Sequence, residues 1–129
     1  MLRSGILNPQ VNALLSRVRH TNQLVIADRG FPFWPTIETV DISLVDDVPT
    51  VLQVLAAIRP NFSIGKALMA TEFAQHNKPE VCAAFAVALG GVPAEYLPHV
   101  EFKRRVPAAI GLIRTGDTTQ YANLILESA

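Results

Sequence analysis

Two side chains that can carry or transfer a proton flank one short apolar run near the start of the sequence. His20 precedes the run at 23–27, "QLVIA", and Asp28 follows it directly. Further candidates of similar chemistry are His99, Lys103, Tyr121 and Asn123. Imidazole, carboxylate, phenol and amide groups suit hydrogen bonding to a polyhydroxylated ligand and the movement of protons. The aromatic stretch at 30–36, "GFPFWPT", offers rings that could pack against the apolar face of a sugar.

Each of the first two residues also has an ordinary structural interpretation. His20 could be a solvated histidine between a helix and a strand, and Asp28 could be a turn residue whose carboxylate caps the following "RG". Asp28 is the stronger candidate, because ligands of α/β sheets gather at the carboxyl ends of strands. A strand of five residues separates its two ends by about 16 Å, so His20 and Asp28 could also serve different subunits.

Other kinds of chemistry lack their signatures. His20, His76 and His99 are the only histidines and no two have a metal-ligand spacing, so we expect no metal. Cys82 lies among small apolar neighbours in "VCAAFAVAL" and reads as a structural thiol. The motifs of acyl transfer, nucleoside triphosphate binding and dinucleotide binding are missing.

The composition indicates one domain, residues 1–129, that associates with copies of itself. Half of the 129 residues are apolar, 17% are charged, and 11 Lys and Arg balance 11 Asp and Glu. That neutrality argues against nucleic acid as the main partner. The positive mean hydropathy of +0.28 indicates more apolar surface than one small core hides, which favours an oligomer. We expect a cytoplasmic location, since there is no signal-peptide pattern and no apolar run that could span a membrane.

The order of the expected elements predicts an α/β domain. Helices are expected over 9–18, from Pro49 to residue 58, over 79–89 and from Pro98, and strands over 23–27 and 39–42. Residues 64–71 could be a strand or a helix. The tail reads as two strands joined by a turn at 116–119. Strands that alternate with helices are typical of α/β folds.

Four blocks of the sequence resemble the ribose pyranase and fucose mutarotase family of small cytoplasmic sugar-processing proteins. They are "GILNPQVNALLSRVRHTNQLVIADRG", "VDISLVDDVPTVLQVLAAI", "PHVEFKRR" and "IRTGDTTQYANLIL", which stand in the family's order and are spread nearly from one end of the chain to the other. The second and fourth blocks look more like the ribose pyranase branch, and "FP" after Gly30 is similar to the fucose branch.

The resemblance implies a three-layer α/β/α domain with a largely parallel sheet. It further implies a ring-shaped decamer with monosaccharide sites at subunit interfaces, and interconversion of anomers or ring forms of a free sugar without a cofactor. Carried over position by position, His20 is the catalytic acid or base. The same comparison makes Asp28, His99, Tyr121 and Asn123 the residues that bind the substrate.

Two positions depart from the family pattern. Asn22 stands where the family usually has an acidic residue, so Asp46, Asp47 or a neighbouring subunit would have to supply a carboxylate to His20. Arg29 replaces a small residue, and it could pair with Asp28 or admit an anionic substrate.

Three functions from different classes follow. The leading hypothesis is a sugar mutarotase or pyranase, and the alternative is a non-catalytic sugar-binding or transport-associated ring protein. A purely structural oligomeric domain would instead leave the polar residues scattered over the surface.

Overall fold

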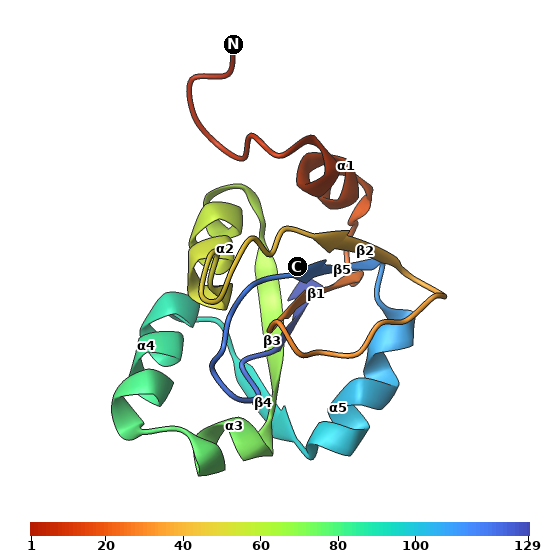
Figure 1. Cartoon of the computed structure of the whole chain (residues 1–129). Coiled ribbons are helices and arrows are strands. Elements are labelled where there is room, and N and C mark those ends of the chain that lie inside the picture. Colours follow the sequence, from red (N-terminus) through yellow and green to blue (C-terminus); the bar gives the residue numbers. More distant parts are fainter.

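A computed structural model describes all residues, 1–129, and its centre is a single six-stranded sheet (Figure 1). The strand order is β2-β5-β1-β6-β3-β4. The strands are β1 Gln23–Ala27, β2 Glu38–Asp41, β3 Ile64–Ala70, β4 Ala94–Leu97, β5 Gly111–Arg114 and β6 Leu124–Ser128. The helices are α1 Pro9–Arg17, α2 Val51–Ile58, α3 Thr71–His76, α4 Pro79–Leu89 and α5 His99–Arg105, with short 3₁₀ turns at Arg59–Asn61 and Val106–Ala108.

The helices begin where side chains satisfy their free N–H groups. At α1 the Asn8 carboxamide oxygen accepts a hydrogen bond from the Val11 amide at 2.9 Å, and Pro9 occupies the first helical position. At α2, Thr50 and Gln53 cap each other's amides in a capping box. α2 therefore begins at Val51, two residues later than the expectation from Pro49.

The sheet is largely parallel, as expected, with one strand reversed. β1 pairs with β5, β5 with β2, and β3 with β4 in parallel, whereas β6 runs antiparallel to both β1 and β3. The prediction that the two tail strands are joined by a simple turn is wrong. β5 and β6 lie on opposite sides of β1, and residues 115–123 form the connection over the end of that strand.

Residues 64–71, left open by the sequence, are mostly strand. β3 runs to Ala70 and is buried over its last four residues, after which α3 begins at Thr71. β4 was missed, because this edge strand is short and largely exposed and so lacks an alternating apolar pattern.

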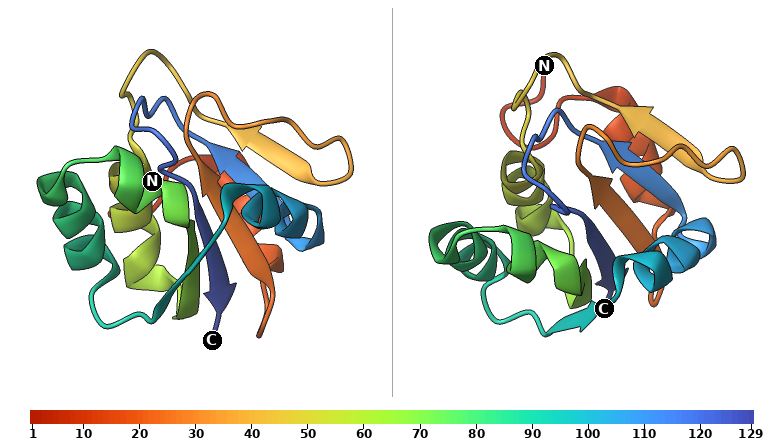
Figure 2. Two further views of the ribbon diagram at one scale, coloured as in Figure 1. Left: turned by 90° about the horizontal axis from the view of Figure 1, so that it is seen from below. Right: turned by 60° about the horizontal axis from the view of Figure 1, so that its bottom comes forward.

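Two apolar cores on the two faces of the sheet make three layers. The larger core joins α1, α2, α3 and α4 to one face, and the smaller core joins α5 and Phe31 to the other. Figure 2 shows α3 and α4 on one side of the sheet and α5 on the other. The predicted α/β/α domain is thus confirmed. None of the helices has the length and apolar character that crossing a membrane requires.

Candidate functional site

Asp28 and Asn123 form a reciprocal pair at the carboxyl end of β1. Asp28 follows β1 and Asn123 precedes β6, and the antiparallel pairing of these strands places the two residues side by side. The Asp28 amide donates to the Asn123 Oδ1 atom at 2.8 Å, and the Asn123 Nδ2 atom donates to Asp28 Oδ2 at 3.0 Å. Asn123 is only 1% exposed, so the carboxylate is held against a buried partner.

The Asp28 carboxylate is held in a partly desolvated position. Burial raises its pKa above the usual value, and the nearby Asp117 carboxylate acts in the same direction. The hydrogen bonds from Asn123 and from the Gly30 amide, the latter at 3.0 Å, oppose the rise. Each carboxylate oxygen accepts one N–H and keeps a further lone pair for a ligand hydroxyl.

His99 stands opposite this pair, at the start of α5. Its backbone amide donates to the Glu72 carboxylate at 2.6 Å, which fixes the beginning of the helix against α3. Its ring is stacked on Phe102 and meets Phe31 and Tyr121 edge to face, with centroids 6.1 Å and 5.0 Å away. The Nδ1 atom is buried and has no hydrogen-bond partner. A buried polar atom of this kind needs a partner from a ligand or water.

The imidazole of His99 favours the neutral form. Burial lowers its pKa below 6.5, and the positive charge of Lys103 lowers it further. The negative charges of Glu72 and Asp28 oppose this shift. A neutral imidazole can donate through one nitrogen and accept through the other.

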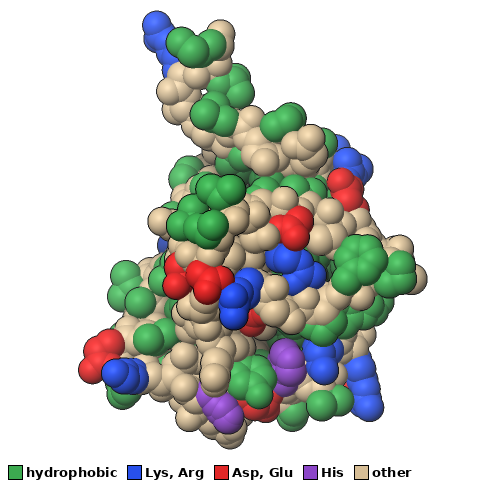
Figure 3. Space-filling view, viewed as in Figure 1, with side chains coloured by type: hydrophobic (Ala, Val, Ile, Leu, Met, Phe, Trp, Pro, Cys, Tyr) green, Lys and Arg blue, Asp and Glu red, His purple; other side chains and the backbone are tan.

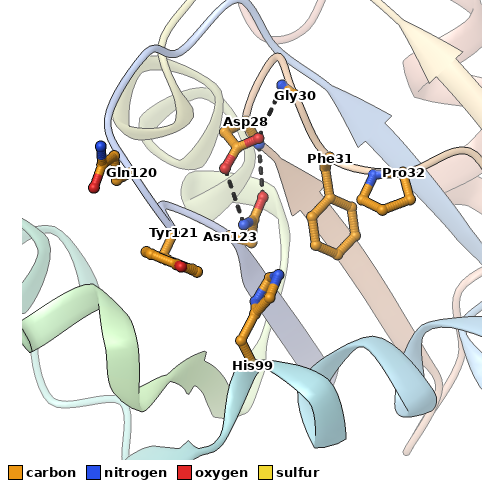
Figure 4. A pocket seen from close by; sticks show the side chains of 8 residues that line it. All are labelled: Asp28, Gly30, Phe31, Pro32, His99, Gln120, Tyr121 and Asn123. Atoms are coloured by element: carbon orange, nitrogen blue, oxygen red, sulfur yellow. Dashed lines mark hydrogen bonds between the residues drawn. The ribbon is translucent and has the colours of Figure 1, made fainter. Parts of the chain in front are cut away.

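These residues enclose one pocket of about 350 Å³ (Figure 4). It is lined by Asp28, Gly30, Phe31, Pro32, His99, Gln120, Tyr121 and Asn123. Four of the five predicted site residues therefore meet in one cavity. The aromatic stretch supplies Phe31, as expected from its composition. Gln120 was not predicted, and its only signal in the sequence was its place beside Tyr121.

His20 does not line this pocket. It is exposed in the turn that precedes β1, at the opposite end of the strand from Asp28. Asn22 closes this turn, since its side-chain oxygen accepts from the Arg19 amide at 2.9 Å and its own amide donates to the Arg19 carbonyl. Within one chain β1 therefore keeps His20 and Asp28 apart, as the length of the strand suggested.

The carboxylates expected to compensate for Asn22 are engaged elsewhere. Asp46 forms an ion pair with Arg29 at 2.6 Å, and Asp47 accepts hydrogen bonds from the amide and hydroxyl of Thr118. These hydrogen bonds hold the pKa of Asp47 below its usual value. Within one chain neither group is a partner of His20, and Arg29 is directed to Asp46 rather than to Asp28.

The remaining candidates have mainly structural surroundings. Lys103 is half-buried, one turn along α5 from His99. His76 lies edge-on to the Tyr121 ring, with centroids 5.1 Å apart. Cys82 is half-buried and packs against the larger core. No three His, Cys, Asp or Glu side chains are grouped so that they could hold a metal ion.

Comparison with known proteins decides the family. The model of the RbsD / FucU transport protein family matches residues 1–129, the full length of the chain. The chain belongs to this family. Among the relatives, D-ribose pyranases from Geobacillus kaustophilus and Chromobacterium violaceum are both 40% identical over 128 residues. These alignments cover 99% of this chain and 93% and 97% of the two relatives. The resemblance stated from the sequence is thereby confirmed.

Solved structures of the RbsD / FucU family share the fold. Bacillus subtilis RbsD, solved in complex with D-ribose, superposes with a TM-score of 0.92 at 32% identity, covering 100% of this chain and 98% of that chain. The fucose mutarotase of Streptococcus pneumoniae, solved with L-fucose, has a TM-score of 0.84 at 18% identity, covering 99% and 98%. This second likeness bears on the fold alone.

The pocket has a clear consequence for the three functional hypotheses. A purely structural domain of the RbsD / FucU family would leave the polar residues scattered, whereas Asp28, His99, Tyr121 and Asn123 converge. The structural hypothesis is therefore set aside, and a sugar-sized site remains.

Proposed function

We propose that this chain is a cofactor-independent isomerase that interconverts anomers or ring forms of a free monosaccharide. The observation that carries the proposal is the Asp28–Asn123 pair, fixed by two hydrogen bonds at the base of a pocket with aromatic walls. The names of the relatives, D-ribose pyranase, support the same chemistry and make D-ribose the first substrate to test.

Sugar recognition follows from the pocket. The free lone pairs of Asp28 accept hydrogen bonds from sugar hydroxyls, and the His99 imidazole, which lines the same pocket, bonds another hydroxyl. Phe31 and Tyr121 offer ring surfaces to the C–H face of the sugar. The volume of about 350 Å³ suits a small ligand of this class.

The substrate is a neutral sugar. Arg29, which the sequence suggested could admit an anionic substrate, is paired with Asp46. Acidic and basic side chains are mixed over the face that carries the pocket, without an extended area of one charge (Figure 3). These features support a hydroxyl-rich ligand over an anionic one.

Ring opening needs two proton transfers. A base removes the proton of the anomeric hydroxyl while an acid protonates the ring oxygen, the bond from the anomeric carbon to the ring oxygen breaks, and an open-chain carbonyl form results. Closure on the other face of the carbonyl, or through a different hydroxyl, gives the product. We assign the acid or base role to His20, as the family resemblance implies, and histidine suits the role since it accepts and releases protons near neutral pH.

His20 reaches the sugar from a second copy of the chain. Its exposed position at the amino end of β1 leaves it free to face a neighbouring subunit. Exposed apolar side chains support an assembly with interfaces, among them Phe33, Leu44 and Val45 at 67%, 77% and 62% exposure. We propose a homo-oligomer, a decameric ring in the form the resemblance implies, with a site at each interface. The cytoplasmic location stays a prediction.

A sugar-binding protein without catalysis is the second candidate. The observation in its favour is that the pocket of one chain contains a complete set of binding groups but not His20. The description of the family model, a transport protein family, fits this alternative as well.

Saturation-transfer NMR on D-ribose separates the two candidates. Saturation of one anomeric proton signal should pass to the signals of the other ring forms at a rate that grows with protein concentration. His20→Ala should abolish this transfer while ligand-induced line broadening persists. Broadening without any transfer in the unaltered protein would establish the binding protein instead. No effect on the spectra of D-ribose, L-fucose or other free aldoses would reject both.

A further inference from the structure

Tyr121 has a backbone conformation that a side chain of its kind rarely adopts. Its φ angle is +56°, in the left-handed region that favours glycine. A bulky residue persists there only when its surroundings hold it, because the conformation itself is unfavourable. The same residue supplies one wall of the pocket, between His76 and His99. Something outside Tyr121 must therefore fix its direction.

Both peptide groups that flank Tyr121 are held by hydrogen bonds. On its carboxyl side, the Tyr121 carbonyl accepts a hydrogen bond from the Asn123 amide at 2.8 Å. On its amino side, the Gln120 carbonyl accepts a hydrogen bond from the Asn77 Nδ2 atom at 2.8 Å. The first bond is local to the connection between β5 and β6, whereas the second comes from a residue 43 positions away. Asn77 thus makes the long-range hydrogen bond that holds this side of the pocket.

Asn77 lies outside the pocket and is anchored on a rigid element. It is the residue that ends α3, and its Nδ2 atom also donates to the Phe73 carbonyl at 2.8 Å. Phe73 is 1% exposed, and its ring packs against Phe85 with centroids 4.7 Å apart. One amide nitrogen therefore connects a helix end fixed in the core to the peptide group just before Tyr121.

We propose that Asn77 is a positioning residue for the sugar site, acting through Tyr121. Its amide selects the left-handed conformation of Tyr121 and so aims the phenol ring at the ligand, which deepens the proposed function and rests on it. The bond to Phe73 alone would be an ordinary helix cap. The hydrogen bond to Gln120 does not contribute to this cap. It fixes the peptide group that precedes Tyr121, and with it the position of the Tyr121 ring in the pocket.

A fluorotyrosine label reports the position of Tyr121 without any ligand. The chain has two tyrosines, and Tyr96 lies 53% exposed on the edge strand β4, outside the pocket, where it serves as an internal reference. Asn77→Ala should shift or broaden the ¹⁹F signal of Tyr121 and leave that of Tyr96 unchanged. Tyr121→Phe removes one of the two signals and so assigns them.

Ligand affinity gives the second measurement. Trp34, the only tryptophan, contacts Phe31 with centroids 5.2 Å apart, so its fluorescence should follow D-ribose binding. Asn77→Ala should weaken D-ribose binding by roughly 3- to 10-fold, as expected for one lost hydrogen bond. In a Tyr121→Ala background the same change should have no further effect, because the two residues act as one unit.

Asn12→Ala is a matched control. The Asn12 Nδ2 atom likewise donates to a backbone carbonyl, that of Ile6, at 2.7 Å, on α1 and outside the pocket. This variant should lose a comparable bond and leave both the Tyr121 signal and D-ribose affinity unchanged. Asn77→Ser, which keeps a single donor, replaces Asn77→Ala if the latter does not fold, with the same expected results.

Two outcomes would overturn the proposal. One is a folded Asn77 variant whose Tyr121 signal and D-ribose affinity match those of the unaltered protein. The other is an additive loss of affinity in the double variant, which would mean that Asn77 acts on the ligand by another route. If the unaltered protein binds no sugar at all, the proposed function fails, while the ¹⁹F comparison still tests the tie between Asn77 and Tyr121.

Discussion

The two ends of β1 carry the two groups that first suggested chemistry, and they are built in opposite ways. At the carboxyl end, Asp28 is partly buried and fixed by Asn123 and Gly30. At the amino end, His20 is exposed, and the hydrogen bonds of its turn are made by Arg19 and Asn22 rather than by the imidazole. At the carboxyl end, residues of the same chain hold the Asp28 carboxylate in place, whereas at the amino end the His20 imidazole is exposed to solvent.

This difference separates recognition from proton transfer. The binding groups are ordered before a ligand arrives, which lowers the entropic cost of binding. In the proposed mechanism, the acid or base would join a site only when another copy of the chain presents it. Assembly would therefore switch catalysis on without changing the binding half of the pocket.

The largest expected effect comes from mixing two inactive variants. His20→Ala should reduce the rate of ring-form exchange by about 100-fold or more, as for the loss of a general acid or base. Asp28→Asn should also abolish exchange, by removing the binding carboxylate. Subunits of the two variants, unfolded and reassembled together in equal amounts, should regain part of the activity, because about a quarter of all sites in a random mixture pair an intact pocket with an intact His20. The measurement is the exchange rate by NMR before and after mixing.

Failure of the mixture to regain activity, with mixed oligomers demonstrated by mass spectrometry, would contradict a site shared between copies. Each variant reassembled alone is the control, and both should stay inactive.

The next effect concerns the stability of the binding end. Asn123→Asp removes the donor to Asp28 and puts a second carboxylate beside it, so it should destabilise the fold by roughly 1–3 kcal/mol near neutral pH. The loss should shrink as the pH falls and one carboxyl of the pair takes up a proton. Urea unfolding at neutral and mildly acidic pH measures both values. Asn61→Asp, at an exposed asparagine, is the control and should change little.

A smaller effect concerns the charge state of His99. Lys103→Met should raise the pKa of His99 towards 6.5 by removing the second cause of its depression, burial being the first. Because the folded pKa lies below the unfolded one, His99 costs stability as the pH falls from 6.5 towards the folded pKa, and the variant should reduce this loss. The ring-proton signals of His99 follow the titration. Arg104→Met, at the exposed neighbouring position, should move them less.

The smallest expected effect is at Arg29. Its ion pair with Asp46 is formed by side chains 58% and 64% exposed, and such pairs contribute about 1 kcal/mol or less. Arg29→Ala should therefore leave thermal stability and D-ribose affinity nearly unchanged. A selective loss of affinity for an anionic sugar such as a uronic acid would contradict the neutral substrate proposed above.

Much of the fold was predictable because its signals are local. Asn8 and Pro9 mark the start of α1, the apolar run of β1 shows a buried strand, and Gly90 follows the end of α4. The pairing of strands is not local, since nothing within residues 111–128 shows that β1 lies between β5 and β6. The exposed strand β4 has no apolar alternation from which to recognise it.

The candidate site likewise has residues that local sequence signals predict and residues that depend on non-local contacts. Asp28 was a candidate from its place after a strand, and the structure brings it together with His99, Tyr121 and Asn123, whose roles came from the family resemblance. Their convergence depends on contacts between distant segments. Asn77 had no signal of its own, because its side-chain bond to Gln120 exists only after α3 and the connection before β6 have come together.

The position of β6 bears on how the protein is made. This strand follows all the others in the chain, yet it lies inside the sheet, between β1 and β3. Without it, β2, β5 and β1 form one ribbon and β3 and β4 another, with no ladder between them. A ribosome delivers the chain from its amino end, so the two ribbons cannot be joined into one sheet until β6 emerges. Asn123 arrives with that strand, and the ability to hold a sugar is therefore acquired in the same step as the closed sheet.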